Sequence, residues 1–228
     1  MNEYHKIQSV YFRDEKNNFK TFLEGQWSEP AFGYLKDNVW VWTEKIDGTN
    51  IRVMWNGKDI TFGGKTDNAQ IPAFLVNRLN DLFEGTKGRK KMRDVFGEEG
   101  EVCLYGEGYG AKIQKGGGNY IPDNQDFILF DVNIGGIWLE RKNVEDIATK
   151  FDIGIVPIVG EGTLEEAIKL VKKGYDSLIG KRQAEGLVMK PKTELLTRRG
   201  HRVITKVKHK DFAEKLMTKE RIKHGSKG

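Results

Sequence analysis

The sequence predicts an α+β fold with mainly antiparallel sheets. Strand-like runs rich in β-branched and aromatic residues outnumber helical runs, and the helices follow the strands at irregular intervals. A doubly wound parallel sheet would instead show strands and helices in regular alternation. One helix start is marked clearly, because Thr163 is followed three residues later by Glu166 in the pattern of a capping box.

The individual elements follow from local patterns. Strands are expected at 39–43, 50–55, 59–62, 101–106, 127–132, 186–190 and 202–207. Apolar residues at helical spacing predict helices at 71–83, 143–151, 164–173 and 211–222. Two glycine-rich, basic segments, 85–93 and 110–120, are expected to be loops that could contact phosphates.

Composition and charge narrow the class of protein. No apolar run approaches the roughly 20 residues that cross a bilayer, and the N-terminal residues lack the pattern of a signal or transit peptide. The single cysteine, Cys103, excludes a disulfide within the chain. We therefore expect a cytoplasmic protein that does not bind membranes. Residues 206–228 carry eight Lys or Arg and three acidic residues, which suggests contact with a polyanion or a solvated helix face.

The candidate nucleophile is Lys45, in the segment TEKIDGTN that joins two predicted strands. A lysine amine can attack an electrophile once it has lost its proton, which neighbouring cations and burial favour. A KxDG tetrapeptide by itself is common, and a surface lysine at a hairpin turn is the simpler interpretation. The motifs that follow along the chain decide between the two.

Four further motifs supply the chemistry of a nucleotide site. Glu107 ends YGE, where it could accept hydrogen bonds from a ribose, and Phe130 in FILFD could stack on a purine or fill a core. Glu185 begins EGLVMK. Lys206 and Lys208 are two residues apart in a predicted strand, so both ammonium groups lie on one face and suit a triphosphate. An exposed strand edge protected by lysines is the other interpretation of that pair.

The ordered set KIDG, YGE, FILFD, EGLVMK and KVK resembles the nucleotidyltransferase motifs shared by ATP-dependent DNA ligases, RNA ligases and mRNA capping enzymes. It extends from residue 44 to 208. The resemblance implies a nucleotidyltransferase (ATP-grasp-like) ligase catalytic domain with helices flanking its sheets. It also implies ATP and Mg²⁺ or Mn²⁺ as cofactors.

Two positions favour the RNA-joining branch. DNA ligases usually have Arg where this chain has Asn50, whereas KxxGTN is similar to the phage-type RNA ligase 2 family and the kinetoplastid RNA-editing ligases. Lys65 lies where that family normally has Arg. A lysine is not equivalent to a guanidinium there, because it lacks the planar fork of donors.

The resemblance also implies a role for each site residue. Lys45 would attack the α-phosphate of ATP to form lysyl-AMP, and AMP would then pass to a 5′-phosphate that a 3′-hydroxyl attacks. Lys206 and Lys208 would hold the α-phosphate, and Glu185 would contact a metal ion or the nucleophile. The remaining expected nucleotide contacts are Glu107 on the ribose, Phe130 on adenine, Lys65 near the phosphates or the 3′ end, and Glu44, Ile46 and Asn50 in the pocket.

The expected organisation is a nucleotidyltransferase domain over residues 1–210 and a short basic helix or tail over 211–228, with no oligonucleotide-binding domain. The expected function is ATP-dependent RNA ligation in RNA repair, on RNA ends or RNA-containing nicked duplexes. A minimal DNA ligase and a non-catalytic nucleic-acid-binding module remain as alternatives, and a capping enzyme is less favoured. A monomer is compatible with the sequence.

Overall fold

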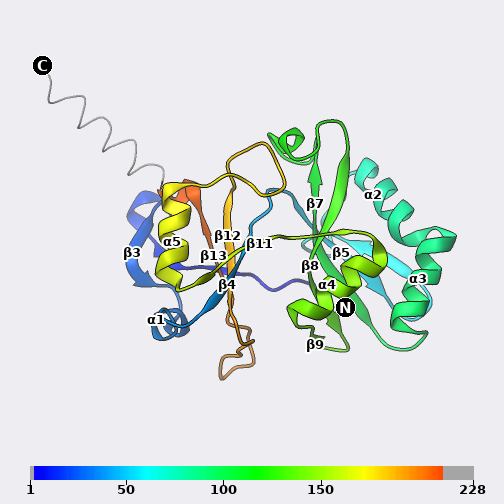
Figure 1. Ribbon diagram of the computed structural model, residues 1–228, viewed down its shortest axis with the longest axis horizontal. Coiled ribbons are helices and arrows are strands. Elements are labelled where there is room, and N and C mark those ends of the chain that lie inside the picture. The colour runs from blue at the N-terminus through cyan, green and yellow to red at the C-terminus, as the bar shows by residue number, and fades with distance from the viewer. Residues whose placement is uncertain (1–2, 213–228) are drawn as a thin grey trace, which may run out of the picture. The chain divides into compact units, whose positions relative to one another are not determined.

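The protein forms two compact units (Figure 1). The structure, a computed structural model, describes residues 3–212. Unit 1 contains residues 3–5, 46–156 and 179–181, and unit 2 contains 6–45, 157–178 and 182–212. Within the described residues, no helix has the length and apolar character needed to cross a membrane.

Unit 1 is built on a sheet with the strand order β10-β8-β7-β5-β6, and β9 pairs with β8. All of these pairs are antiparallel except β8 with β10. Its strands are β5 (Thr49–Trp55), β6 (Ile60–Gly63), β7 (Val102–Gly110), β8 (Gln125–Ile134), β9 (Ile137–Trp138) and β10 (Gly154–Ile155). Its helices are α2 (Ala73–Leu79), the π-helix η2 (Asn80–Glu84), α3 (Thr86–Phe96), the 3-10 turn η3 (Gly117–Asn119) and α4 (Arg141–Phe151).

The main core of unit 1 lies between one face of this sheet and the helices. Leu75 and Leu79 of α2 and Met92 of α3 are fully buried against strand residues such as Leu104 and Leu129. A second, smaller cluster contains the buried side chains of Ile46, Tyr120, Ile128 and Val156 together with the partly buried Phe130. Residues 127–132 of β8 are apolar except for Asp131. Such a run is usual for a strand that is covered on both faces.

Unit 2 contains a five-stranded sheet with the order β1-β13-β12-β4-β11, in which only β1 and β13 are parallel. A short β2-β3 hairpin accompanies it. The strands are β1 (Gln8–Ser9), β2 (Tyr11–Arg13), β3 (Phe22–Trp27), β4 (Trp40–Glu44), β11 (Ile158–Gly162), β12 (Gly186–Pro191) and β13 (Thr205–Lys208). The helices are η1 (Glu15–Asn17), α1 (Pro30–Tyr34), α5 (Leu164–Lys173) and η4 (His209–Phe212).

Helix α5 shows why the second core forms. Thr163 caps it, its side chain accepting from the backbone N–H of Glu166 while the Glu166 carboxylate accepts from Thr163 N, as the capping box predicts. The helix buries Leu164, Ala167 and Val171 in one cluster with the sheet residues. This spacing places the three side chains on one face of the helix.

The predicted α+β class with mainly antiparallel sheets is therefore confirmed. Two local predictions are wrong. Segment 85–93 was expected to be a loop but lies in α3, and strand 202–207 occurs as 205–208 because Arg202 instead bridges to Leu196 and forms an ion pair with Glu194. Of the helix predicted at 211–222, Asp211 and Phe212 lie in η4, and the rest falls outside the described residues. The single catalytic domain over 1–210 stays a prediction.

Candidate functional site

Three charged residues that are distant in the sequence meet at one end of the unit 2 sheet. Strand β4 runs into Lys45, β12 starts directly after Glu185, and β13 ends at Lys208. The antiparallel pairing of Glu44 with Leu187 and of Lys208 with Gly186 places these strand ends side by side. Two backbone bonds extend the pairing past the strands, from Lys45 N to Gly186 O and from His209 N to Glu185 O, both at 2.9 Å.

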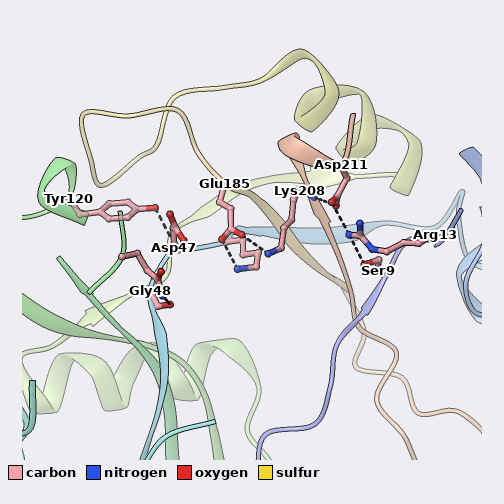
Figure 2. Close-up of polar contacts among 10 residues, drawn as sticks. Ser9, Arg13, Asp47, Gly48, Tyr120, Glu185, Lys208 and Asp211 are labelled. Carbon is pink, nitrogen blue, oxygen red and sulfur yellow. Dashed lines mark hydrogen bonds and ion pairs between the residues drawn. The ribbon is translucent and has the colours of Figure 1, made fainter. Parts of the chain in front are cut away.

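Glu185 bridges the two lysines (Figure 2). Its Oε2 lies 2.6 Å from Lys45 Nζ and its Oε1 lies 2.6 Å from Lys208 Nζ. Burial alone would raise the pKa of Glu185, but the ammonium groups of Lys45 and Lys208 outweigh it and hold the pKa below its ordinary value. The carboxylate is thus ionised and shared between a nucleophile candidate and a second cation.

The other lysine of β13 lies on the same side of its strand. Lys206 and Lys208 are both partly exposed, while Thr205 and Val207 between and before them are buried. The strand alternation predicted for this pair is confirmed. Lys206 therefore lies on the face that presents Lys208.

The surroundings fix Lys208 and the turn after it. Asp211 accepts a hydrogen bond from Lys208 N at 3.2 Å and pairs with Arg13 at 2.8 Å, and Arg13 reaches Ser9 at 3.4 Å (Figure 2). The Asp211 side chain is almost completely buried. These contacts connect the end of β13 to β1 and β2, and no motif in the sequence indicated them.

Glu44 is in unit 2 and has a different environment from its neighbour Lys45. Its side chain is buried, and its carboxylate accepts hydrogen bonds from Ser177 Oγ at 2.5 Å and Leu178 N at 2.8 Å. In the structure it anchors the segment that follows α5. Its expected place in a nucleotide pocket stays a prediction.

Unit 1 carries three of the expected nucleotide contacts, Asn50, Glu107 and Phe130. Asn50, Glu107 and Ile128 are direct partners across β5, β7 and β8, so their side chains share a face. Phe130, two residues beyond Ile128, belongs to the same apolar cluster and meets the ring of Tyr4 edge-on at 5.1 Å. The opposite face of the sheet is the one that α2 covers. Gly106, the neighbour of Glu107 in β7, points to that opposite face, because a Cβ on it would meet Phe127 of the main core.

One atom on this face is suited to a ligand. The Oδ1 of Asn50 is buried and has no hydrogen-bond partner among the residues described. A buried amide oxygen normally has a donor, so a ribose hydroxyl or another donor would complete its bonding. Ile46, by contrast, is a buried member of the small apolar cluster.

Lys65 is exposed in the loop after β6, and the sequence did not show what holds that loop. Arg52 of β5 is fully buried; its Nε donates to Gly64 O at 2.9 Å and its Nη2 lies 2.7 Å from Asp67 Oδ1. The two contacts bracket Lys65 and Thr66. Arg52 lies two residues after Asn50, which is the only signal that could have pointed to it.

A metal ion would find few ready ligands here. No group of three or more His, Cys, Asp or Glu side chains suitable for a metal occurs within residues 3–212. Mg²⁺ is often held by one or two carboxylates together with substrate phosphates and water. Both carboxylate oxygens of Glu185 are paired with lysines. Glu185 could serve as one such carboxylate if Lys45 or Lys208 moved away from its oxygen.

Comparisons with known proteins bear on the family and the fold of this chain. The sequence matches the model of the RNA ligase family over residues 38–208. Structures of Naegleria gruberi RNA ligase variants are similar in fold. A variant with ATP and Mn has a TM-score of 0.66 at 18% identity, covering 94% of this chain and 58% of that chain.

Two more structures of that protein give the same result. A variant with AMP and Mn has a TM-score of 0.63 at 19% identity over 94% of this chain and 60% of the other, and an apo variant has 0.63 at 18% over 94% and 59%. This chain therefore spans about three fifths of the length of these RNA ligases. At such identities the likeness shows the fold.

Proposed function

Because this chain belongs to the RNA ligase family, we propose that it joins RNA ends in an ATP-dependent reaction in which Lys45 carries the adenylyl group. The observation that carries the proposal is the bridge of Glu185 between Lys45 and Lys208 at one sheet end. The match to the family extends over all three residues. The family match indicates the class of reaction. The bridge provides a lysine, Lys45, that is held by the Glu185 carboxylate and has a second cation, Lys208, beside it.

The first step is an in-line displacement at phosphorus. Lys45 Nζ, once deprotonated, attacks the α-phosphorus of ATP; an N–P bond forms, the bond to the bridging oxygen breaks, and pyrophosphate leaves. The side chains of Lys206 and Lys208 neutralise the charge on the α-phosphate oxygens. Glu185 orients the Lys45 amine in the resting protein.

The second and third steps transfer and release AMP. A 5′-phosphate oxygen of RNA attacks the same phosphorus, the N–P bond breaks, and Lys45 is regenerated. A 3′-hydroxyl then attacks the 5′-phosphate, loses its proton and displaces AMP, which seals the strand. For each step the protein supplies alignment and charge neutralisation.

The other residues are proposed to hold the nucleotide. Asn50 and Glu107 bind the ribose, which agrees with their shared sheet face and the unpartnered Asn50 Oδ1. Phe130 contacts the adenine, and Glu44 and Ile46 complete the pocket. Lys65 lies at the phosphates or the 3′ end. A divalent ion, Mg²⁺ or Mn²⁺, held by Glu185, water and phosphate oxygens, would withdraw charge from the reacting phosphate.

Covalent labelling tests the proposal. The protein is incubated with ATP or GTP labelled at the α-phosphate and a divalent metal, then denatured and separated on a gel. We expect an adduct with ATP that is lost in Lys45→Met and kept in Lys192→Met; Lys192 follows the end of β12 that is opposite Glu185, and it pairs with the exposed Glu161. No adduct in the wild type, or an equal adduct in Lys45→Met, would overturn it.

A joining assay tests the substrate class. Duplexes with a 5′-phosphorylated nick and a 3′-hydroxyl strand of RNA or DNA are compared, together with single-stranded RNA ends. We expect RNA at the 3′ side to be joined faster, and a preference for an all-DNA nick would contradict the RNA assignment. A cytoplasmic location is proposed from the single, buried Cys103. Cell fractionation tests it, and recovery in another compartment would contradict it.

A further inference from the structure

The glycine-rich segment 110–120, which joins β7 to β8 in unit 1, is fastened to the turn that follows the nucleophile. Asp47 N donates to the hydroxyl of Tyr120 at 3.3 Å (Figure 2), and Gln114 Nε2 donates to Gly48 O at 3.0 Å. Asp47 and Gly48 are the second and third residues after Lys45. The segment, called here the 110–120 loop, therefore lies directly against the KIDG turn.

The 110–120 loop has a defined conformation. Ala111 N donates to the carbonyls of Ile121 and Asn124 at 3.1 and 2.8 Å, and Gly117 approaches Gly110 so closely that a Cβ would lie 2.0 Å from its carbonyl oxygen. Lys112 has φ 64°, in the left-handed region that side chains other than glycine rarely adopt. Such strain in a bonded loop is typical of functional segments.

The 110–120 loop is basic, and no ion pair to its lysines occurs among the residues that the structure describes. Lys112 and Lys115 are exposed, and no acidic residue occurs between Gly108 and Pro122. A third exposed lysine is added by segment 179–181, because Lys181 N donates to Asn119 O at 2.8 Å. None of the three ammonium groups forms an ion pair within the described part of the chain.

Other surface lysines of unit 1 differ in this respect. Lys90 and Lys150 each pair with an aspartate one helical turn away, at 2.8 and 2.7 Å. The ammonium groups of Lys90 and Lys150 are therefore paired with carboxylates of their own helices. The three loop lysines have no such partner within residues 3–212, so their charge can meet an external anion next to the loop's contacts with Asp47 and Gly48.

We propose that Lys112, Lys115 and Lys181 bind the phosphate backbone of the RNA strand being joined. This inference rests on the proposed function, whose reaction requires a polynucleotide at Lys45. Exposed ammonium groups suit successive phosphates and carry no sequence preference. Contact with the phosphates of ATP itself is the competing source of the same anion, and the test separates the two.

The test compares a triple variant, Lys112→Gln/Lys115→Gln/Lys181→Gln, with the wild type. Binding of a 5′-phosphorylated single-stranded RNA is measured by fluorescence anisotropy at several salt concentrations, without ATP. Each phosphate contact contributes about 0.7 to the slope of log K against log salt, so the slope should fall by about 2. At roughly 0.1 M salt this corresponds to about 5-fold weaker binding per lysine and on the order of 100-fold for all three.

Two further variants make the result specific. Lys58→Gln/Lys87→Gln/Lys142→Gln removes three exposed lysines that also lack ion pairs in the described structure of unit 1, and should keep the wild-type slope apart from a small general charge effect. Replacing the three loop lysines by Arg should retain affinity. Adenylylation at saturating ATP should be unchanged in the triple Gln variant.

Three outcomes would overturn the inference: an unchanged salt slope, an equal loss in the control triple, or a raised KM for ATP with unaltered RNA affinity. The RNA-binding measurement needs no adduct. A wild type that binds RNA through the loop but forms no adduct would overturn the proposed ligase reaction and leave the RNA-binding surface standing.

Discussion

Replacing Glu185 by Gln should destabilise the protein as well as stop the proposed adenylylation. The substitution keeps the shape of the side chain but leaves Lys45 and Lys208 as two cations around a neutral amide. The Glu185 side chain is 13% exposed and each lysine is 21% exposed. Removing one member of a buried pair costs about 3–5 kcal/mol, and partial exposure of the lysines reduces this to an expected ~2–4 kcal/mol.

The pH dependence of this loss identifies its origin. Because the folded protein lowers the pKa of Glu185 from 4.5, the carboxylate contributes stability above that value, and the contribution is lost as pH falls through the lowered pKa. The free energy of unfolding of the wild type should therefore exceed that of Glu185→Gln by a constant amount from about pH 8 to about pH 5.5. Below about pH 4.5 the two should converge.

Urea unfolding followed by circular dichroism measures this difference. Glu161→Gln is the matched control, because Glu161 pairs with Lys192 at 2.7 Å on an exposed surface and its removal should cost less than about 1 kcal/mol. A Glu185→Gln loss no larger than that of the control, or one that does not change on acidification, would refute the reasoning that the bridge is held by charge.

Three other predictions concern unit 1. Burial raises the pKa of the Cys103 thiol to about 11, so alkylation near neutral pH should be slow in the native protein and fast in urea; rapid native labelling would contradict this. Gly48→Ala would place a Cβ 2.3 Å from a β7 carbonyl oxygen and should cost about 1–3 kcal/mol in urea unfolding, whereas Gly118→Ala, with open space around it, should cost little. Arg52→Lys loses the planar fork that reaches Asp67 and a carbonyl, and should cost about 1–3 kcal/mol; stability equal to the wild type would exclude the role given to the fork.

Strands with strong patterns and the capped helix could be predicted from the sequence, because local propensity and tertiary packing agree in them. Helix α3 could not. Its glycines and basic residues suggested a loop, yet lysine and arginine are good helix formers, and Gly88 is required because a Cβ would lie 2.3 Å from Phe83 O. In a sequence, a glycine required by a close contact looks the same as a glycine in a flexible loop.

The candidate site also has features that the sequence predicts and features that it does not. Motif order connected Lys45, Glu185 and Lys208, and antiparallel strand ends explain why they meet. The occupation of both carboxylate oxygens by lysines depends on side-chain placement that no motif specifies. Arg52 escaped notice for a related reason, because its partners are a backbone carbonyl and an exposed loop residue.

Connection 192–204, between β12 and β13, joins the ends of these strands that point away from Glu185 and Lys208. The register of the site is set within the strands, where a shift of one residue would turn every side chain to the opposite face. Extra residues placed at the exposed Gly200, where φ is already 79°, would leave that register intact. The hairpin therefore offers a place to attach a fluorophore or a tether for following the proposed joining reaction, at the opposite end of the sheet from Lys45.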